Sequence, residues 1–323
     1  MSRRILTLLL PLLGSVAPLW AATAAPFTSA PVIAGVMADA RLAETSGLAA
    51  SRSRPGALWV HNDSGNTPEL HLMSAEGARL ASVTIDGVRN IDWEDLAAFD
   101  LGGKRYLLVA DTGDNGGLRR TLELVVVEEP ATITDGMRLT PAWTLRFRWP
   151  DGARDCEAVA VDAAAGEVLL VSKKRVPPEL FRVALRPTRQ GLQTARRIGR
   201  LRGIAQPNAA ELTQNPVYGR YRSQVTAADL SPDGRTLAVL NYQAVFLYQR
   251  GPGTDWSDAL SNPQRLDFTW MPQAEAMGYS LDGRQLWVAG EQRPSPLIHF
   301  LFAPLDGDII LISDDRAFPG ARP

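Results

Sequence analysis

Acidic side chains recur in pairs at the start of apolar stretches along this chain. Asp92 and Glu94 stand two residues apart before one such stretch, and Asp155 and Glu157 stand two residues apart before another. Side chains two apart in a β-strand share one face, so each pair would present two carboxylates together. Carboxylates this close repel one another unless a cation or protons intervene. The pattern therefore predicts a site built from carboxylate oxygens.

Further polar residues follow the glycine turns of the same segments. In the segment 89–115, two apolar runs flank the turn Gly102-Gly103, which is typical of an antiparallel hairpin. The start of the first strand and the end of the second then lie at the same edge, so the polar residues of both should converge. The strand ends add these side chains to that edge: Asn62, Asp63, Asp111, Asp114, Asn115, Lys173, Lys174, Asn241, Tyr242 and Glu291.

This hairpin plan recurs five times, at intervals of about 50 to 70 residues, which is the range of solenoid and propeller repeats. Each repeat has room for one or two further strands, such as 122–130 and 144–150, and shows no convincing helix. Four-stranded antiparallel repeats predict an all-β fold, a β-propeller for which we expect five blades, with a degenerate sixth as the alternative. Aligning the turn glycines gives equivalent positions to Glu44, Glu94, Glu157, Thr226 and Glu275.

The expected blades follow one another along the chain and cover 44–88, 89–150, 151–203, 223–271 and 272 onward. The strand candidate 31–37 would complete the last blade, because ring closure removes free sheet edges. The run 308–315 is either a fourth strand of that blade or a tail. Residues 204–222 break the pattern and predict an inserted loop, of the kind that often forms the wall of a site.

First strands line the central channel of a propeller, so the carboxylate pairs would ring one mouth of it. Oxygen ligands without His or Cys suit Ca²⁺ rather than zinc. The chain has only three histidines and no HExxH or CxxC spacing. The alternative is that these carboxylates form hydrogen bonds to neighbouring blades. The candidate Ca²⁺ ligands are Glu44, Glu94, Asp111, Asp114, Asp155 and Glu275.

The leading functional hypothesis is a metal-dependent hydrolase of phosphoesters or esters, with Asp92 and Glu157 as catalytic carboxylates. Bound metal would polarise the substrate and lower the pKa of an attacking water, while Lys173 or Lys174 stabilises developing charge. The lysines could equally be counter-ions for the acids. The alternative function is a non-catalytic module that binds a small molecule, peptide, glycan or envelope partner. The expected binding residues are Asn62, Asp63, Arg89, Asn115, Asn241, Tyr242 and Glu291.

Other reactive or aromatic residues have structural explanations. Cys156 is the only cysteine, so an intramolecular disulfide is excluded, and its place at a strand start is typical of a small core residue. Ser46 lies on a strand and not on a strand-to-helix elbow, which argues against nucleophilic catalysis. Trp59 and Trp93 are expected to pack between blades rather than to bind ligand.

Composition and the N-terminus set the protein class. The 34 basic residues against 35 acidic ones argue against nucleic-acid binding, and 45% hydrophobic content argues against disorder. Arg3 and Arg4 precede an apolar run, and small residues follow at 22–24, so residues 1–24 are expected to be a signal peptide. The remainder, 25–323, is then a single propeller domain, a monomer in the periplasm or outside the cell. It would have no stable membrane span.

Several motifs together resemble a known group of proteins: ETSGL with LWVHNDSGN, NIDWED, DTGDN, DCEAVAVD, VTAADLSPDG and QAEAMGYSLDG. As a set they resemble an exported bacterial β-propeller family of obscure role, and more distantly the esterase-like, phytase-like and SdiA-regulated propellers. The resemblance implies a calcium-bound or ligand-binding propeller, some members of which hydrolyse phosphoesters or esters. This chain departs from the phytases because it lacks their dense basic cluster. Lys173, Lys174 and Arg89 are its basic candidates near the mouth.

Overall fold

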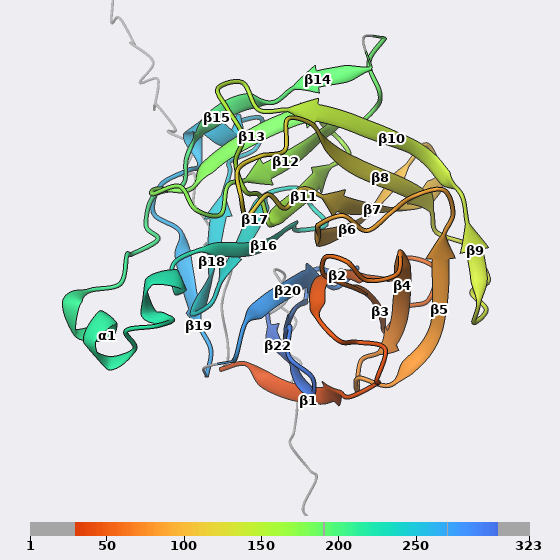
Figure 1. The fold of residues 1–323 in the computed structure, drawn as a ribbon, viewed down its shortest axis with the longest axis horizontal. Coiled ribbons are helices and arrows are strands. Elements are labelled where there is room, and N and C mark those ends of the chain that lie inside the picture. Colours follow the sequence, from red (N-terminus) through yellow and green to blue (C-terminus); the bar gives the residue numbers. More distant parts are fainter. Residues whose placement is uncertain (1–29, 190, 270, 303–323) are drawn as a thin grey trace, which may run out of the picture.

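The computed structural model describes residues 30–189, 191–269 and 271–302. The expected signal peptide and the run 308–315 lie outside these residues. The described strands form five sheets arranged as blades around a central axis (Figure 1). The predicted five-bladed β-propeller is confirmed.

Each blade is an antiparallel sheet whose first strand lies nearest the axis. Blade 1 contains β2 (Thr45–Ala50), β3 (Ala57–Asn62), β4 (Glu69–Ser74) and β5 (Arg79–Ile85). Blade 2 contains β6 (Trp93–Leu101), β7 (Lys104–Asp111), β8 (Leu122–Glu128) and β10 (Pro141–Arg148). Blade 3 contains β11 (Ala158–Asp162), β12 (Glu167–Val171), β13 (Glu179–Ala184) and β15 (Arg196–Arg200). Blade 4 contains β16 (Val225–Leu230), β17 (Thr236–Asn241), β18 (Ala244–Gln249) and β19 (Gln264–Asp267).

Blade 5 closes the ring with strands from both ends of the described chain. It contains β20 (Ala274–Tyr279), β21 (Gln285–Gly290), β22 (Ser295–Leu301) and β1 (Val32–Met37). Strand β1 pairs antiparallel with β22, with Val32 opposite His299. The predicted closure by the 31–37 segment is confirmed, and it satisfies an edge that would otherwise be open to other strands.

Two short strands extend blades 1 and 2 beyond the expected four. Strand β9 (Met137–Leu139) pairs parallel with β5, and β14 (Leu192–Thr194) pairs parallel with β10. Each lies in the connection between the third and fourth strands of the next blade and reaches back to the outer edge of the preceding one. Three-residue strands are too short to show an alternating pattern, so the sequence does not predict them.

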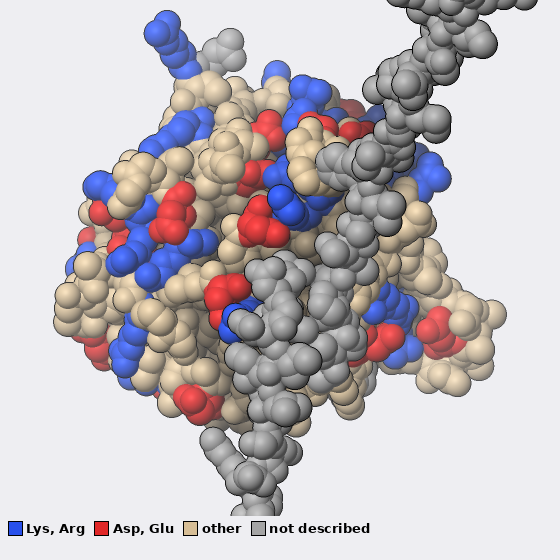
Figure 2. Space-filling model, turned by 180° about the vertical axis from the view of Figure 1, so that it is seen from behind, with Lys and Arg blue, Asp and Glu red and all other residues tan. Residues whose placement is uncertain are grey.

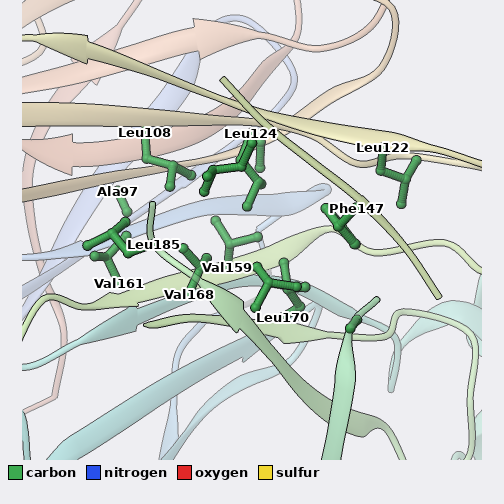
Figure 3. Packing of buried hydrophobic residues seen from close by; sticks show 14 of the residues in the cluster. Ala97, Leu108, Leu122, Leu124, Phe147, Val159, Val161, Val168, Leu170 and Leu185 are labelled. Atoms are coloured by element: carbon green, nitrogen blue, oxygen red, sulfur yellow. The ribbon is translucent and has the colours of Figure 1, made fainter. Parts of the chain in front are cut away.

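Apolar side chains fill the space between neighbouring blades. Leu108 and Leu124 of blade 2 pack against Val159, Val168 and Leu170 of blade 3 (Figure 3). Burial of such strand faces supplies most of the stability of the ring, at about 25 cal/mol per Å² of apolar surface. Both Trp59 and Trp93 are fully buried in the cluster shared by blades 1 and 2, so their predicted packing role is confirmed.

The strand register corrects one part of the repeat alignment. Pairing of the first and second strands shifts at one residue near the same end of four blades. The residue at this shift is Ser46 in blade 1, Glu94 in blade 2, Thr226 in blade 4 and Glu275 in blade 5. The equivalent of Glu94 in blade 1 is therefore Ser46, and the alignment of Glu44 with it was wrong. The connection between β2 and β3 is longer than the corresponding connection in the other blades, which misplaces an alignment made on turn glycines.

Asp95 is fully buried on β6, among the first strands of the blades. Its Oδ2 accepts hydrogen bonds from the backbone N–H of Val159 at 2.8 Å and of Ala228 at 3.0 Å, and its Oδ1 accepts one from Leu96 at 2.8 Å. One carboxylate thus joins the first strands of blades 2, 3 and 4. Burial raises the pKa of Asp95 well above its ordinary value, although these hydrogen bonds lower it.

Asp229 performs a similar task between blades 4 and 5. Its carboxylate accepts hydrogen bonds from the backbone N–H groups of Tyr279 and Leu230, both at 2.8 Å. Burial raises the pKa of Asp229 from 3.8 to about 6. Between pH 3.8 and about pH 6, Asp229 therefore keeps its proton in the native state and releases it in the unfolded chain. The contribution of this group is therefore most favourable below pH 4 and is lost as the pH rises through about 6.

We expect Asp229→Asn to flatten the pH dependence of stability. The full pKa shift of Asp229 corresponds to about 3 kcal/mol in the free energy of unfolding. Because Asp229 is partly exposed, we expect a pH-dependent loss of about 2 kcal/mol. Urea unfolding near pH 4 and near pH 7 measures the effect. The wild type should lose about 2 kcal/mol more than the variant between the two conditions. Identical losses would show that Asp229 does not titrate in this range.

Candidate functional site

The starts of the first strands and the ends of the second strands meet at one end of the ring. Trp93 pairs with Asp111, the N–H of Gly113 donates to the carbonyl of Asp92 at 3.2 Å, and the N–H of Lys173 donates to the carbonyl of Asp155 at 3.1 Å. The convergence predicted from the hairpins is present. We call this end the acidic mouth, after its carboxylates: Glu44, Asp63, Asp92, Glu94, Asp155, Glu157, Glu275 and Glu291.

Three of these carboxylates form a first group that makes no ion pair with the described residues, although the charges of Lys173 and Arg119 act on it from farther away. One oxygen from each of Asp63, Asp92 and Glu94 lies within 4.8 Å of the others. Glu94 is only 4% exposed, yet its carboxylate has no hydrogen bond or ion pair with any residue that the structure describes. The Asp92 carboxylate is half-buried, and it too has no hydrogen bond or ion pair with the described residues. A buried carboxylate without a partner is costly, so this group favours a cation.

The pKa shifts of this group follow from burial and like charge. Burial raises the pKa of Glu94 well above its ordinary value, and the neighbouring carboxylates of Glu157 and Asp63 raise it further. Burial also raises the pKa of Asp92 to about 6, with added repulsion from Asp63 and Asp155. Both shifts mean that the negative form is disfavoured unless a positive charge enters.

A second group shares Glu94 and contains Asp155 and Glu157, with oxygens again within 4.8 Å. Here cations are already present. Lys173 forms an ion pair with Glu157, and the Nζ of Lys174 lies 2.8 Å from Asp155 Oδ2. Burial alone would lower the pKa of Lys173, but the Glu157 carboxylate outweighs it and the net shift is upward. The structure therefore places both lysines as counter-ions, one of the two roles that the sequence left open.

A glycine makes the close packing of the first group feasible. A Cβ at Gly113 would lie 2.0 Å from Glu94 Oε1 and 2.4 Å from Asp92 Oδ2. Such distances are far below van der Waals contact, so any larger residue would displace both carboxylates. No sequence signal marks Gly113 as part of the site, because a glycine in a DTGDN loop is equally consistent with ordinary turn chemistry.

The remaining carboxylates of the mouth lie toward blades 1 and 5. The Tyr242 hydroxyl donates to Glu275 Oε1 at 2.7 Å. Gln273 donates to Glu291, whose pKa is raised to about 8 by burial and by the charges of Glu275, Asp63 and Glu44. Glu44 is exposed and accepts a hydrogen bond from Asn66 at 3.0 Å. Glu44 thus lies at the rim, although its register differs from that expected.

Three predicted site residues have their polar atoms engaged within the protein. The amide of Asn62 donates to the carbonyl of Arg41 at 2.7 Å and accepts from the N–H of Glu44 at 3.1 Å. Asn241 Oδ1 accepts two backbone N–H bonds at 2.9 Å each. Both oxygens of Asp114 accept backbone N–H bonds, at 2.7 and 3.0 Å. These contacts organise the loops of the mouth.

The other predicted residues are placed as follows. Asp111 forms an ion pair with Arg119 at 2.6 Å, a partner that no sequence signal indicated. Asn115 is exposed and accepts from Lys174 Nζ at 2.7 Å. Arg89 is exposed and has no hydrogen bond or ion pair with the described residues.

The insertion at 204–222 differs from the expected loop because it contains a short helix, α1 (Ala209–Gln214), and the 3₁₀ turn Gly219–Tyr221. Asn208 and Glu211 form a capping box at the start of α1, a signal visible in the sequence. Figure 1 shows α1 beside the ring and not over the central strands. A second 3₁₀ turn, Trp256–Asp258, lies between β18 and β19. None of the described helices is long and apolar enough to cross a membrane.

Neither Cys156 nor Ser46 is suited to nucleophilic catalysis. Cys156 is fully buried, and burial raises its pKa to about 12, so the reactive thiolate is disfavoured. The Ser46 hydroxyl donates to the Glu94 carbonyl at 2.8 Å.

Two surface hollows lie at the opposite end of the ring and share Ala50, Ser280 and Leu281 in their linings. They do not coincide with the acidic mouth. We place the site at the mouth because buried, unpaired carboxylates indicate a ligand more strongly than concavity does. On the face seen in Figure 2, basic and acidic side chains of the described residues are interspersed, without one continuous basic field.

No family model matches the chain, and no curated protein matches it. Among solved structures, the chain is similar to the WD40 repeats of RRP9, at 14% identity and a TM-score of 0.36 over 80% of this chain and 67% of that one. It is also similar to a hydrazine synthase of Kuenenia stuttgartiensis, at 10% identity and a TM-score of 0.42 over 81% of this chain and 84% of that one. A third similar structure is a nidogen/laminin complex, at 11% identity and a TM-score of 0.41 over 77% of this chain and 73% of that one. These values are too low to support a functional argument.

Proposed function

We propose that the acidic mouth binds a divalent cation, with Ca²⁺ as the best fit, through Asp63, Asp92 and Glu94. The observation that carries this proposal is the Glu94 carboxylate, which is 4% exposed, lacks a partner and lies within ligand distance of two other carboxylates. The donor set consists of oxygen alone, which suits Ca²⁺. Ca²⁺ accepts six to eight oxygens, so three carboxylates would leave positions for water or for an oxygen of a ligand.

Calcium should stabilise the wild type and not the variant Glu94→Gln. A cation that binds only the native state adds about 2 kcal/mol when its free concentration is roughly thirty times Kd. Such a gain corresponds to about 3 °C in melting temperature for a domain of this size. Without calcium, Glu94→Gln should melt above the wild type, because the substitution removes a buried charge. Differential scanning calorimetry with calcium and with chelator measures both effects.

Glu128→Gln is the matched control, since Glu128 is exposed and pairs with Lys104 at the start of β7, away from the mouth. This variant should keep the full calcium response. Equal melting temperatures of the wild type in calcium and in chelator would contradict the proposal. The carboxylates would then be structural groups only.

Hydrolysis of a phosphoester or ester is a second candidate, and Asp92 favours it. Asp92 is half-buried beside Glu94 and has no partner in the described ranges, so the carboxylate oxygen that does not hold the cation could take a proton from a cation-bound water. Lys174, whose side chain is 41% exposed, could reach an anionic substrate, whereas Lys173 is 10% exposed. Loss of turnover in Asp92→Asn tests this candidate.

We further propose that the protein acts in the periplasm or outside the cell on a small-molecule or envelope ligand. The basic and apolar pattern of residues 1–24 supports export. The sequence resemblance to exported propellers points the same way. A fusion of residues 1–24 to a reporter that is active only after export would test this.

A further inference from the structure

A lysine of the chain itself lies against the second carboxylate group of the mouth. Lys173 forms an ion pair with Glu157, and its side chain is only 10% exposed. The Lys173 Nζ lies 5.8 Å from the centre of the Tyr242 ring, and the Tyr242 hydroxyl donates to Glu275 at 2.7 Å. A lysine held this closely by a carboxylate and an aromatic face has the surroundings of a bound cation.

The two groups differ in charge balance, although they share Glu94. Asp63, Asp92 and Glu94 bring three negative charges and no ion-paired cation among the described residues. Glu94, Asp155 and Glu157 bring the same three charges, but Lys173 and Lys174 pair with two of them. Electrostatic attraction for a divalent ion is therefore greater at the first group, and an ion at the second would meet two ammonium charges.

We infer that Lys173 occupies the position of a second divalent cation and so limits the acidic mouth to one bound ion. This inference rests on the proposed cation site at Asp63, Asp92 and Glu94. The independent sign of a ligand is Glu94, whose buried carboxylate lacks a partner and belongs to both groups. With the Lys173 ammonium removed, Glu94 could bridge two ions, with Glu157 as a ligand of the second, while Lys174 still pairs with Asp155. Bridged pairs of this kind lie about 3.5–4 Å apart.

The test is the number of calcium ions bound per chain, measured by equilibrium dialysis with radioactive Ca²⁺. We expect one ion in the wild type and two in Lys173→Met, a doubling. The control variant Lys104→Met removes the same charge from an exposed ion pair with Glu128, at the end of blade 2 opposite the mouth. This variant should still bind one calcium ion. Adding Glu157→Gln to Lys173→Met should return the number to one, because it removes a ligand of the second ion.

The outcomes separate this inference from the proposed function. One ion in both the wild type and Lys173→Met would overturn the role of Lys173 and leave the first site intact. No ion in the wild type would overturn the proposed function itself. Lys173→Gln serves if the methionine variant does not fold, since its amide can still donate to Glu157. Near-ultraviolet circular dichroism checks that each variant is folded. For Lys173→Gln, two bound calcium ions are again the expected result.

Discussion

Replacing Asp95 by alanine is expected to lower the free energy of unfolding by roughly 4 kcal/mol or more. The substitution leaves the backbone N–H groups of Val159 and Ala228 without acceptors in the interior of the ring. Each buried donor without a partner costs about 1–3 kcal/mol, and the contact of Asp95 with Leu96 is lost as well. Removal of a buried charge offsets part of this loss. Urea unfolding followed by tryptophan fluorescence measures the change.

Two variants calibrate that result. Asp95→Asn keeps one carbonyl oxygen but turns an amide toward the remaining donor, so we expect a smaller loss of about 1–2 kcal/mol. Asp100→Ala removes an exposed carboxylate of the same strand, which pairs with Arg52, and should cost less than about 1 kcal/mol. Asp95→Ala with the stability of the wild type would show that the three blades do not depend on this carboxylate.

Asp92→Asn is expected to reduce kcat/KM by about 10²- to 10⁴-fold if the mouth is catalytic. A base that accepts the proton of a cation-bound water cannot be replaced by a neutral amide. Glu157→Gln should have a smaller effect, because Glu157 already pairs with Lys173. The assay compares phosphomonoesters, aryl esters and lactones with purified mature protein in the presence of calcium.

The control for this assay is again Glu128→Gln, which should keep the rate of the wild type. Turnover that survives in Asp92→Asn would remove the catalytic role of this residue. Absence of turnover across the whole panel, together with retained calcium binding, would favour the alternative. The mouth would then be a non-catalytic, cation-dependent binding site for an envelope ligand.

Local patterns in the sequence were sufficient for the fold and for the convergence of the polar side chains at one end of the ring. Glycine turns between short apolar runs specify hairpins, because turn chemistry and two-residue alternation act between neighbours in the chain. Repetition of the hairpin indicated the five blades, and the unpaired segment 31–37 indicated the closure with β22. The same geometry brings Asp92 and Asp155 to one end. Misplacement of Glu44 shows the limit, since loop length shifts the register without changing the pattern.

Only the tertiary structure decided which carboxylates are neutralised and which are not. Lys173 pairs with Glu157 and Arg119 with Asp111, whereas Glu94 has no partner in the described chain, and all lie in similar sequence surroundings. Asp95 reaches Val159 and Ala228, which are 64 and 133 residues away. These contacts depend on distances between blades, which are fixed when the ring closes and the apolar faces pack. No pattern within one repeat carries that information, because alternation specifies a side chain's face and not its partner.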